Sequence, residues 1–447
     1  MAELSDFLKK PSPVVEAIYA NYKKEGDSEP SRGYLGASII GHPCERSLWF
    51  AFRGCCKPEF SGRMYRLFET GDLAEDRFAK NLRDIGCTVH THDENGEQFA
   101  VSAFGGHFSG HMDGCILGVP GAEKTWHVLE EKTHSNKNFK KLVKEGVSMA
   151  FWKHHAQMQI YMHLTGMGRA LYLATNKDTD DLYAERLRYS KDDAEKLMER
   201  AERIITNPIA PNGLSDRRDF WQCKFCDAKD ICFGSPSDEP VLVIPSLSCR
   251  QCCHATPKMD GISRWVCEKH GKSLSHVDQA TPCKDHLLLP SMLPAFIAEE
   301  YSKDEDGNDF IRFKASDGSE WEHGKGNGKF SSRELMKINL KAILNPMVAK
   351  AKETFNATVT GCCTDLLEGC PEGQRSVLWK GRPSGILAAW DALRAKWGPG
   401  PNDKPLSTMK ALEYTSLPTH CVAKYHDGMF VVSYTIENRS EIFKLIP

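Results

Sequence analysis

At 447 residues the chain is longer than one ordinary domain, so we expect two or three. Its composition, 40% hydrophobic and 26% charged, is typical of soluble globular proteins, and no apolar run approaches the roughly 18 residues that span a bilayer. The formal net charge of −2 excludes a basic surface over the whole protein, so any nucleic-acid surface must be local. The 17 cysteines and the absence of a secretory signal favour a reducing, cytoplasmic compartment and metal binding over disulfides.

Helical and strand patterns alternate through the first half of the chain. After a loose or helical segment over residues 1–30, apolar residues recur at helical spacing from Met64 to Ile85. The next expected elements, in chain order, are strands at 88–92, 98–104, 108–117 and 126–133, a helix at 150–164, strands at 169–175 and 183–189, and a charged helix at 192–205. This order predicts an α/β sandwich.

The second half is divided by composition. Residues 236–247 are rich in Pro and Ser and form an expected linker, which would end a first domain at residues 1–235. A cysteine- and histidine-rich module is expected at 248–290, followed by a C-terminal α+β domain at 291–447 in which no chemistry is readable. Strand-like patterns in that domain cover 310–313 and 429–435, a helix-like pattern covers 332–344, and four cysteines look like ordinary core residues: Cys362, Cys363, Cys370 and Cys421.

The strongest motif lies on two of the expected strands. Glu130 and Lys132 alternate with Glu131, so they share one face of a strand, and Asp113 lies on the strand expected before it. Two carboxylates that hold Mg²⁺ or Mn²⁺, with a positive group beside them, form the chemistry of phosphodiester hydrolysis. A solvated surface charge is the usual explanation for any single acidic residue, but the combination favours a site.

A further ligand is expected from the helix over 64–85. Glu75 is the candidate, and Asp72 and Asp76 compete for the same role.

These residues resemble a known family. The set Gly71…Glu75, Gly110-His111-Met112-Asp113-Gly114, Glu130-Glu131-Lys132-Thr133 and Gln157…Tyr161 is similar to the RecB-like branch of the PD-(D/E)XK nucleases. The resemblance implies a restriction-endonuclease-like core, a central mixed sheet flanked by helices. It also implies metal ligands at Glu75, Asp113 and Glu130, a catalytic Lys132, and a helix that presents Gln157 and Tyr161 to DNA.

Two parts of the resemblance leave alternatives open. Glu75 stands where many members have His, a departure also found in phage-type exonucleases, so the type of this outer ligand differs from the common pattern. Gln157 and Tyr161 share a helix face, one turn apart, but a buried Tyr beside a hydrogen-bonded Gln is an equally good explanation.

Lysines follow the Glu-x-Lys strand with no intervening acid. Such a cluster can bind phosphates without reading sequence, although lysine runs are usually solvated faces. The candidates for DNA binding are Lys137, Lys140, Lys141 and Lys144.

A first cysteine motif has the spacing C-x2-C-x5-C at Cys223, Cys226 and Cys232. Zinc and iron–sulfur sites both commonly take four protein ligands, so a distant fourth cysteine is expected. Cys44 is the best candidate, and Cys55 and Cys56 are weaker ones. One cysteine before the core and three after it resemble the [4Fe–4S] staple of iron–sulfur RecB-like nucleases, including those of CRISPR adaptation; zinc is the alternative.

A second motif combines a C-x2-C pair with two later Cys-x2-His pairs, which suggests a small zinc module. Since tetrahedral Zn²⁺ takes four ligands, not all candidates can bind one ion. The favoured set is Cys249, Cys252, Cys267 and Cys283, with His270 and His286 as alternates.

Taken together, the residues and the resemblance predict a metal-dependent DNA exonuclease acting at linear ends. Its expected setting is recombination, repair or replication, encoded by a bacteriophage or mobile element and working with a recombination or single-strand-annealing protein. An endonuclease, a trimming nuclease like those of CRISPR adaptation, or a DNA-binding protein on a nuclease scaffold are the alternatives. No G-x4-G-K-[ST] motif is present, so unwinding is not expected.

Overall fold

The structure is a computed structural model, and it describes residues 12–29, 32–234, 242–336 and 340–344, together with the backbone of the strands beyond residue 357. The chain divides into two compact units. The first comprises 1–216, 256–266 and 271–274, and the second comprises 217–255, 267–270 and 275–447. Residues of the expected cysteine-rich module thus belong to both units. No described helix is both long and apolar enough to cross a membrane.

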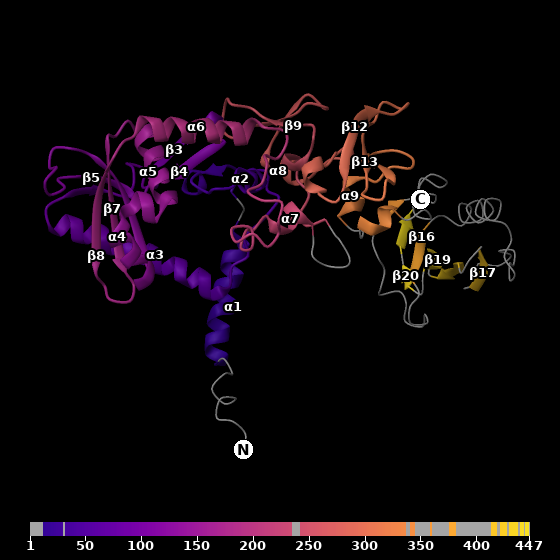
Figure 1. Cartoon of the computed structure of the whole chain (residues 1–447), viewed down its shortest axis with the longest axis horizontal. Coiled ribbons are helices and arrows are strands. Elements are labelled where there is room, and N and C mark those ends of the chain that lie inside the picture. The colour runs from indigo at the N-terminus through magenta and orange to yellow at the C-terminus, as the bar shows by residue number, and fades with distance from the viewer. Residues whose placement is uncertain are drawn as a thin grey trace, which may run out of the picture. The chain divides into compact units, whose positions relative to one another are not determined.

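A five-stranded mixed sheet forms the centre of the first unit (Figure 1). Its order is β2-β5-β6-β7-β8, in which only β6 and β7 run parallel. The strands are β2 (Thr88–His90), β5 (Gly114–Leu117), β6 (His127–His134), β7 (Arg169–Asn176) and β8 (Leu182–Arg188). The α/β architecture expected from the order of elements is present, with more than one sheet.

Helices pack on both faces of this sheet. Phe78 and Leu82 of α3 (Gly62–Asp84) join one buried cluster with Leu129 of β6, so α3 covers the face of the odd-numbered β6 residues. The helix α5 (Trp152–Thr165) contacts Glu130 on the opposite face and ends at Gly166, which adopts φ 73°. Both helices were predicted from apolar spacing, and both are confirmed. The other helices of this unit are α1 (Pro13–Ser28), α2 (Glu45–Phe52), α4 (Asn136–Ala150) and α6 (Lys191–Thr206).

The first unit also contains a second, three-stranded sheet, whose last strand in the chain directly precedes β5. It consists of β1 (Leu35–Gly36), β4 (Phe108–His111) and β3 (Ala100–Ala103), in the order β1-β4-β3. The prediction of a single strand over 108–117 is therefore wrong. The chain leaves the small sheet at His111, passes through Met112 and Asp113, and enters the large sheet at Gly114. This break places Asp113 between the two sheets.

The parallel pair β6 and β7 requires a crossover, and the chain supplies it as two helices, α4 and α5. The helix α4 was not among the expected elements. Gly146 inside it has the non-helical angles φ 73° and ψ 168°. Its buried residues therefore fall into two pairs, Phe139 with Leu142 and Val147 with Ala150, and the step of five positions between the pairs interrupts the spacing of one continuous helix.

The second unit begins with a turn that leads into α7 (Lys229–Phe233) and contains the antiparallel sheet β12-β13-β14. Its other short elements are α8 (His276–Ala280) and α9 (Ser332–Leu335), and the sheet strands are β12 (Ile297–Lys303), β13 (Asp309–Lys314) and β14 (Glu320–Gly324). Three short strands, β9 (Ala255–Pro257), β10 (Trp265–Cys267) and β11 (Lys272–Leu274), form a small sheet whose residues lie mostly in the first unit. Of the expected helix over 332–344, α9 and a 3-10 turn at 340–344 are described.

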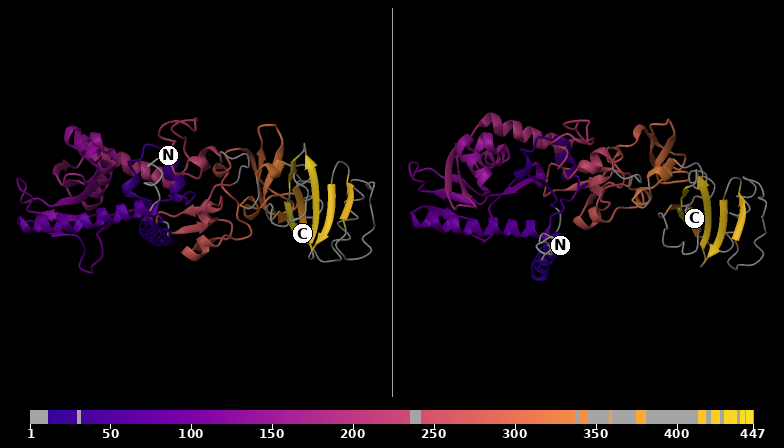
Figure 2. Two further views of the ribbon diagram at one scale, coloured as in Figure 1. Left: turned by 90° about the horizontal axis from the view of Figure 1, so that it is seen from below. Right: turned by 60° about the horizontal axis from the view of Figure 1, so that its bottom comes forward.

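Beyond residue 357 the backbone forms one sheet of seven strands, drawn in yellow and orange in Figure 2. The strands are β15 (Thr358–Val359), β16 (Arg375–Lys380), β17 (Glu413–Leu417), β18 (Cys421–His426), β19 (Met429–Ile436), β20 (Arg439–Glu441) and β21 (Phe443–Ile446). The strand expected at 429–435 is β19. The core role expected for four cysteines falls outside the described side chains (Cys362, Cys363, Cys370 and Cys421).

Candidate active site

Two glycines explain the motif around Asp113. A Cβ on Gly110 would lie 2.8 Å from an atom of Tyr161, and a Cβ on Gly114 would lie 2.6 Å from the carbonyl oxygen of His90. Both contacts are too short for any side chain, so glycine lets the chain pass close to α5 and to β2. These two close approaches fix the short connection that carries Asp113.

Asp113 also supplies a hydrogen-bond acceptor at the end of the β5–β6 ladder. The β5–β6 ladder begins at Gly114 paired with Leu129, so no strand residue faces the N–H of Glu131 on that side. The Asp113 Oδ2 atom accepts this N–H at 2.7 Å. A carboxylate that accepts a backbone N–H is held at a defined position, which a metal ligand requires.

Lys132 contacts both predicted carboxylates. Its Nζ lies 2.7 Å from Glu130 Oε1 and 3.2 Å from Asp113 Oδ2. The Glu130 side chain has no exposed surface, and that of Lys132 is 26% exposed. Burial alone would lower the pKa of Lys132, but Glu130 and Asp113 outweigh it and raise that pKa above its ordinary value. Lys132 is therefore protonated in this arrangement.

Gln157 and Tyr161 hold the buried end of Glu130. Gln157 Nε2 donates to Glu130 Oε2 at 3.2 Å and to the Tyr161 hydroxyl at 3.1 Å. That hydroxyl donates in turn to the carbonyl oxygen of His111 at 2.6 Å, just before Asp113. One chain of hydrogen bonds thus links both carboxylate-bearing segments. Both residues are nearly completely buried, so here they position the site from within the protein.

Glu131 lies on the face of β6 opposite to Glu130, and Glu75 of α3 lies beside it. They line a cavity of about 140 Å³ together with Lys132 and Thr133. Asp72 and Asp76, which competed with Glu75 in the sequence, are exposed.

Burial, and then Asp113, raises the pKa of Glu75 to about 7 and that of Glu131 to about 9. Burial likewise raises the pKa of Glu130 to about 8. Three carboxyl groups in a small volume resist ionisation unless positive charge is supplied.

The carboxyl groups fit a divalent metal. Among the described residues, the buried Glu131 Oε1 has no hydrogen-bond partner, and Glu130 Oε1 has only its ion pair with Lys132. Oxygen donors are the ligands that Mg²⁺ and Mn²⁺ prefer. Asp113 and Glu130 would hold the ion. In the described part of the chain, however, Glu75 does not join these two in a group whose ligand atoms all lie within 4.8 Å.

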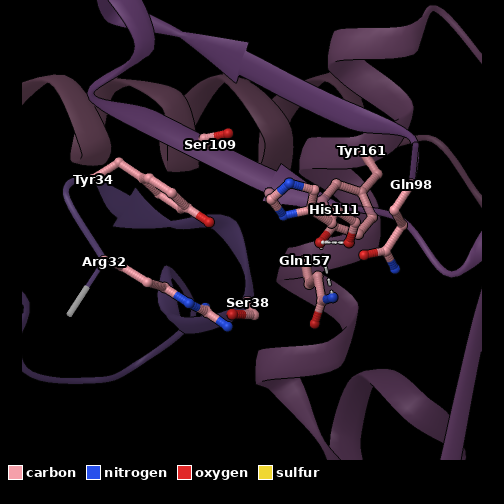
Figure 3. A pocket seen from close by; sticks show the side chains of 9 residues that line it. Arg32, Tyr34, Ser38, Gln98, Ser109, His111, Gln157 and Tyr161 are labelled. Carbon is pink, nitrogen blue, oxygen red and sulfur yellow. Dashed lines mark hydrogen bonds between the residues drawn. The ribbon is translucent and has the colours of Figure 1, made fainter. Parts of the chain in front are cut away.

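A second cavity, of about 230 Å³, opens beside Gln157 and Tyr161 (Figure 3). Arg32, Tyr34 and Ser38 line it from the segment around β1. Its remaining lining residues are Gln98, Ser109, Gly110 and His111. Arg32, Tyr34 and Ser38 were not expected at a site, since no spacing relates them to Gln157 and Tyr161, more than a hundred positions later.

The four lysines expected to bind DNA lie on α4. Lys137, Lys140, Lys141 and Lys144 are all exposed, at the spacing of one helix face, while Phe139 and its neighbour Leu142 are buried. Lys141 differs from the others, because it donates to the carbonyl oxygen of Ala150 at 3.0 Å.

The first cysteine motif surrounds the start of α7. Cys223 and Cys226 lie on the preceding turn, where the N–H of Cys226 donates to the carbonyl oxygen of Cys223 at 3.1 Å. Cys232 lies within α7, and all three are half-buried. Cys44, the expected fourth ligand, belongs to the first unit at the start of α2. The iron–sulfur assignment stays a prediction.

The second cysteine motif separates into two groups. Burial is the main cause that raises the pKa of Cys252 to about 12, and the nearby thiols Cys249 and Cys267 add to it. Cys283 is exposed, with its Sγ 3.5 Å from His270 Nε2. His286, an alternate zinc ligand in the sequence, instead contacts the Ser332 hydroxyl and the carbonyl oxygen of Ser248.

Comparisons with known proteins add no argument to this geometry. No protein-family model and no curated protein matches the sequence. Among solved structures, the chain is similar to SSO0001, at 16% identity over 49% of this chain and 96% of that one, with a TM-score of 0.28. An alkaline exonuclease from Laribacter hongkongensis, LHK-Exo, is similar at 13% identity over 42% of this chain and 90% of its own, with a TM-score of 0.27, and its complex with dAMP gives 0.28. At TM-scores this low the similarity carries no information about function, which is inferred below from the site alone.

Proposed function

We propose that this protein is a Mg²⁺- or Mn²⁺-dependent deoxyribonuclease that degrades DNA from its ends. The observation that supports it most is the convergence of Asp113 and Glu130 on the ammonium of Lys132. Opposite charges at these distances, partly buried at the junction of two sheets, suit the hydrolysis of a charged phosphodiester.

Each residue has a defined task in this proposal. A bound divalent ion would polarise the phosphate and lower the pKa of the attacking water. Asp113 and Glu130 would hold that ion, with Glu75 as an outer ligand. Lys132, protonated by its surroundings, supplies positive charge beside the phosphorus centre rather than acting as a base. Gln157 orients Glu130 through its hydrogen bond.

The cavity shown in Figure 3 supports action at ends rather than at internal sites. It is small, about 230 Å³, and combines the guanidinium of Arg32 with the hydroxyl groups of Tyr34 and Ser38. Arginine and hydroxyl donors are the usual ligands of a phosphate. We therefore place a terminal phosphate there, with the exposed lysines of α4 holding DNA farther along.

The [4Fe–4S] cluster at Cys44, Cys223, Cys226 and Cys232 belongs to the same proposal as a structural group. Anaerobically purified protein is then expected to be brown and to contain iron and sulfide; zinc alone at these thiols would refute the cluster. The expected setting in recombination, with a strand-annealing partner, rests on the family resemblance alone.

Cleavage of linear and closed circular DNA tests the proposal. With Mg²⁺ or Mn²⁺ the unaltered protein should shorten end-labelled linear duplex and leave closed circles intact. Asp113→Asn should leave both the linear and the circular DNA intact. Cutting of closed circles would replace the proposal by an endonuclease. DNA binding without cleavage under any divalent metal would replace it by a binding protein. Arg32→Gln, which leaves the carboxylates untouched, should reduce the preference for phosphorylated ends.

A further inference from the structure

Three metal-ligand side chains gather in the second unit, apart from the proposed nuclease site. His270 follows β10, and Cys283 and Asp285 follow α8. Their ligand atoms all lie within 4.8 Å of one another, and within the described residues no other set of three or more His, Cys, Asp and Glu side chains does so. The sequence motif contained His270 and Cys283, but Asp285 matched no spacing and was missed.

The separations agree with a tetrahedral ion. His270 Nε2 lies 3.5 Å from Cys283 Sγ and 3.6 Å from Asp285 Oδ2. Bonds of about 2.0–2.3 Å from Zn²⁺ to nitrogen, oxygen and sulfur place neighbouring ligands about 3.3–3.7 Å apart at the tetrahedral angle. Little movement would be needed to close the three groups on one ion.

The surrounding chain orients these ligands. Lys325 Nζ contacts Asp285 Oδ1 at 3.2 Å, so the other oxygen, Oδ2, is the one that faces His270. Partners of this kind, behind a ligating carboxylate, fix its orientation. The following segment is anchored as well, because the N–H of Cys253 donates to the carbonyl oxygen of Leu287 at 2.7 Å.

We propose that His270, Cys283 and Asp285 bind one Zn²⁺, with the fourth position open to solvent. A thiolate and an imidazole favour Zn²⁺ over Mg²⁺ or Mn²⁺, so this ion differs from the one at the nuclease site. His270 and Cys283 are exposed, which leaves the ion accessible to water and to chelators. The ion ties residue 270 to residues 283–285 and closes the chain between them into a loop. The proposal does not depend on the nuclease function.

The assignment changes the zinc ligands expected from the sequence. Cys283 binds with His270 and Asp285 rather than with Cys249 and Cys252. The two sets make opposite predictions for Asp285→Asn and Cys249→Ser. Both variants keep Cys283, so they separate the sets without removing the shared thiol.

Zinc content of the full chain, measured by mass spectrometry after dialysis against buffered Zn²⁺, tests the proposal. Asp285→Asn and Cys283→Ser should each lose the same single equivalent, the double variant should lose no more, and Lys325→Met should bind it ~10-fold more weakly. Cys249→Ser and the exposed control His276→Gln should retain it. Thiolate absorption bands of Co²⁺ bound in place of Zn²⁺ should disappear in Cys283→Ser.

Two results would overturn the site. One is loss of the equivalent in Cys249→Ser with retention in Asp285→Asn, which would restore the four-cysteine set. The other is an equal zinc content in the unaltered protein and in Cys283→Ser. Far-UV circular dichroism of each variant separates loss of the ligand from loss of the fold.

Discussion

Replacing Lys132 by Met removes the charge that both carboxylates contact while keeping most of the side chain's volume. Loss of one group that stabilises the developing charge is expected to slow cleavage ~10²–10³-fold. Stability should fall too, because Glu130 has no exposed surface and loses an ion partner at 2.7 Å. Removing one member of a buried pair costs about 3–5 kcal/mol. We expect the lower end, because Gln157 still donates to Glu130, which can also take up a proton.

The assay compares Mg²⁺-dependent shortening of linear duplex DNA with urea unfolding for the same preparations. Lys124→Met, an exposed lysine that has no part in the proposed site, is the matched control and should change neither quantity appreciably. The double variant Glu130→Gln, Lys132→Met replaces both charges by neutral groups. It should unfold less readily than Lys132→Met alone, since no uncompensated carboxylate remains. Folded Lys132→Met protein that cleaves within threefold of the unaltered rate would refute the role of this lysine. Additive losses of stability in the double variant would refute the pairing.

Three further outcomes follow from the same geometry. Tyr161→Phe removes the hydroxyl that donates to the carbonyl oxygen at the end of β4; it should cost about 1–2 kcal/mol in urea unfolding and slow cleavage about tenfold or more, with Tyr189→Phe as control. Gly110→Ala places a Cβ 2.8 Å from other atoms and should cost about 1–3 kcal/mol, whereas Gly168→Ala, which meets nothing within 4 Å, should be tolerated. Burial lowers the pKa of His134 to about 4 in the folded protein, below its unfolded value. The contribution of neutral His134 to the stability of the folded state is therefore complete above about pH 6.5 and is lost as the pH falls toward 4. Between pH 7 and pH 5 the free energy of unfolding, measured with urea, should therefore fall by about 2 kcal/mol less in His134→Gln than in the unaltered protein. Equal falls would contradict the lowered pKa of His134.

Local patterns predicted much of the first unit. Alternation along β6 placed Glu130 and Lys132 on one face, and the structure has Lys132 in contact with Glu130. Apolar spacing predicted α3 and α5, with each end within two residues of the observed one. These features depend on neighbours in the chain, which a periodic pattern records.

What the sequence missed depends on distant contacts. The strand expected over 108–117 is alternating enough to look continuous, but its halves pair with different strands. Asp285 lies near His270 only because the chain folds back after α8. Glu131, expected to point away from the site, is buried beside Glu75, because α3 covers that face as well. Burial on both faces of a strand is set by packing rather than by alternation.

Because Asp113 lies between the two sheets, its distance from Glu130 depends on two restraints: the N–H of Glu131 on the large sheet, which Asp113 accepts, and the position of the small sheet that precedes it in the chain. The hydroxyl of Tyr161 donates to the carbonyl oxygen of His111, the last residue of β4, and so holds the small sheet in position next to α5. Under the proposed function, DNA bound in the cavity beside Ser109 would shift the small sheet and so change the separation of the two carboxylates. Affinity for the metal ion and affinity for DNA would then be coupled.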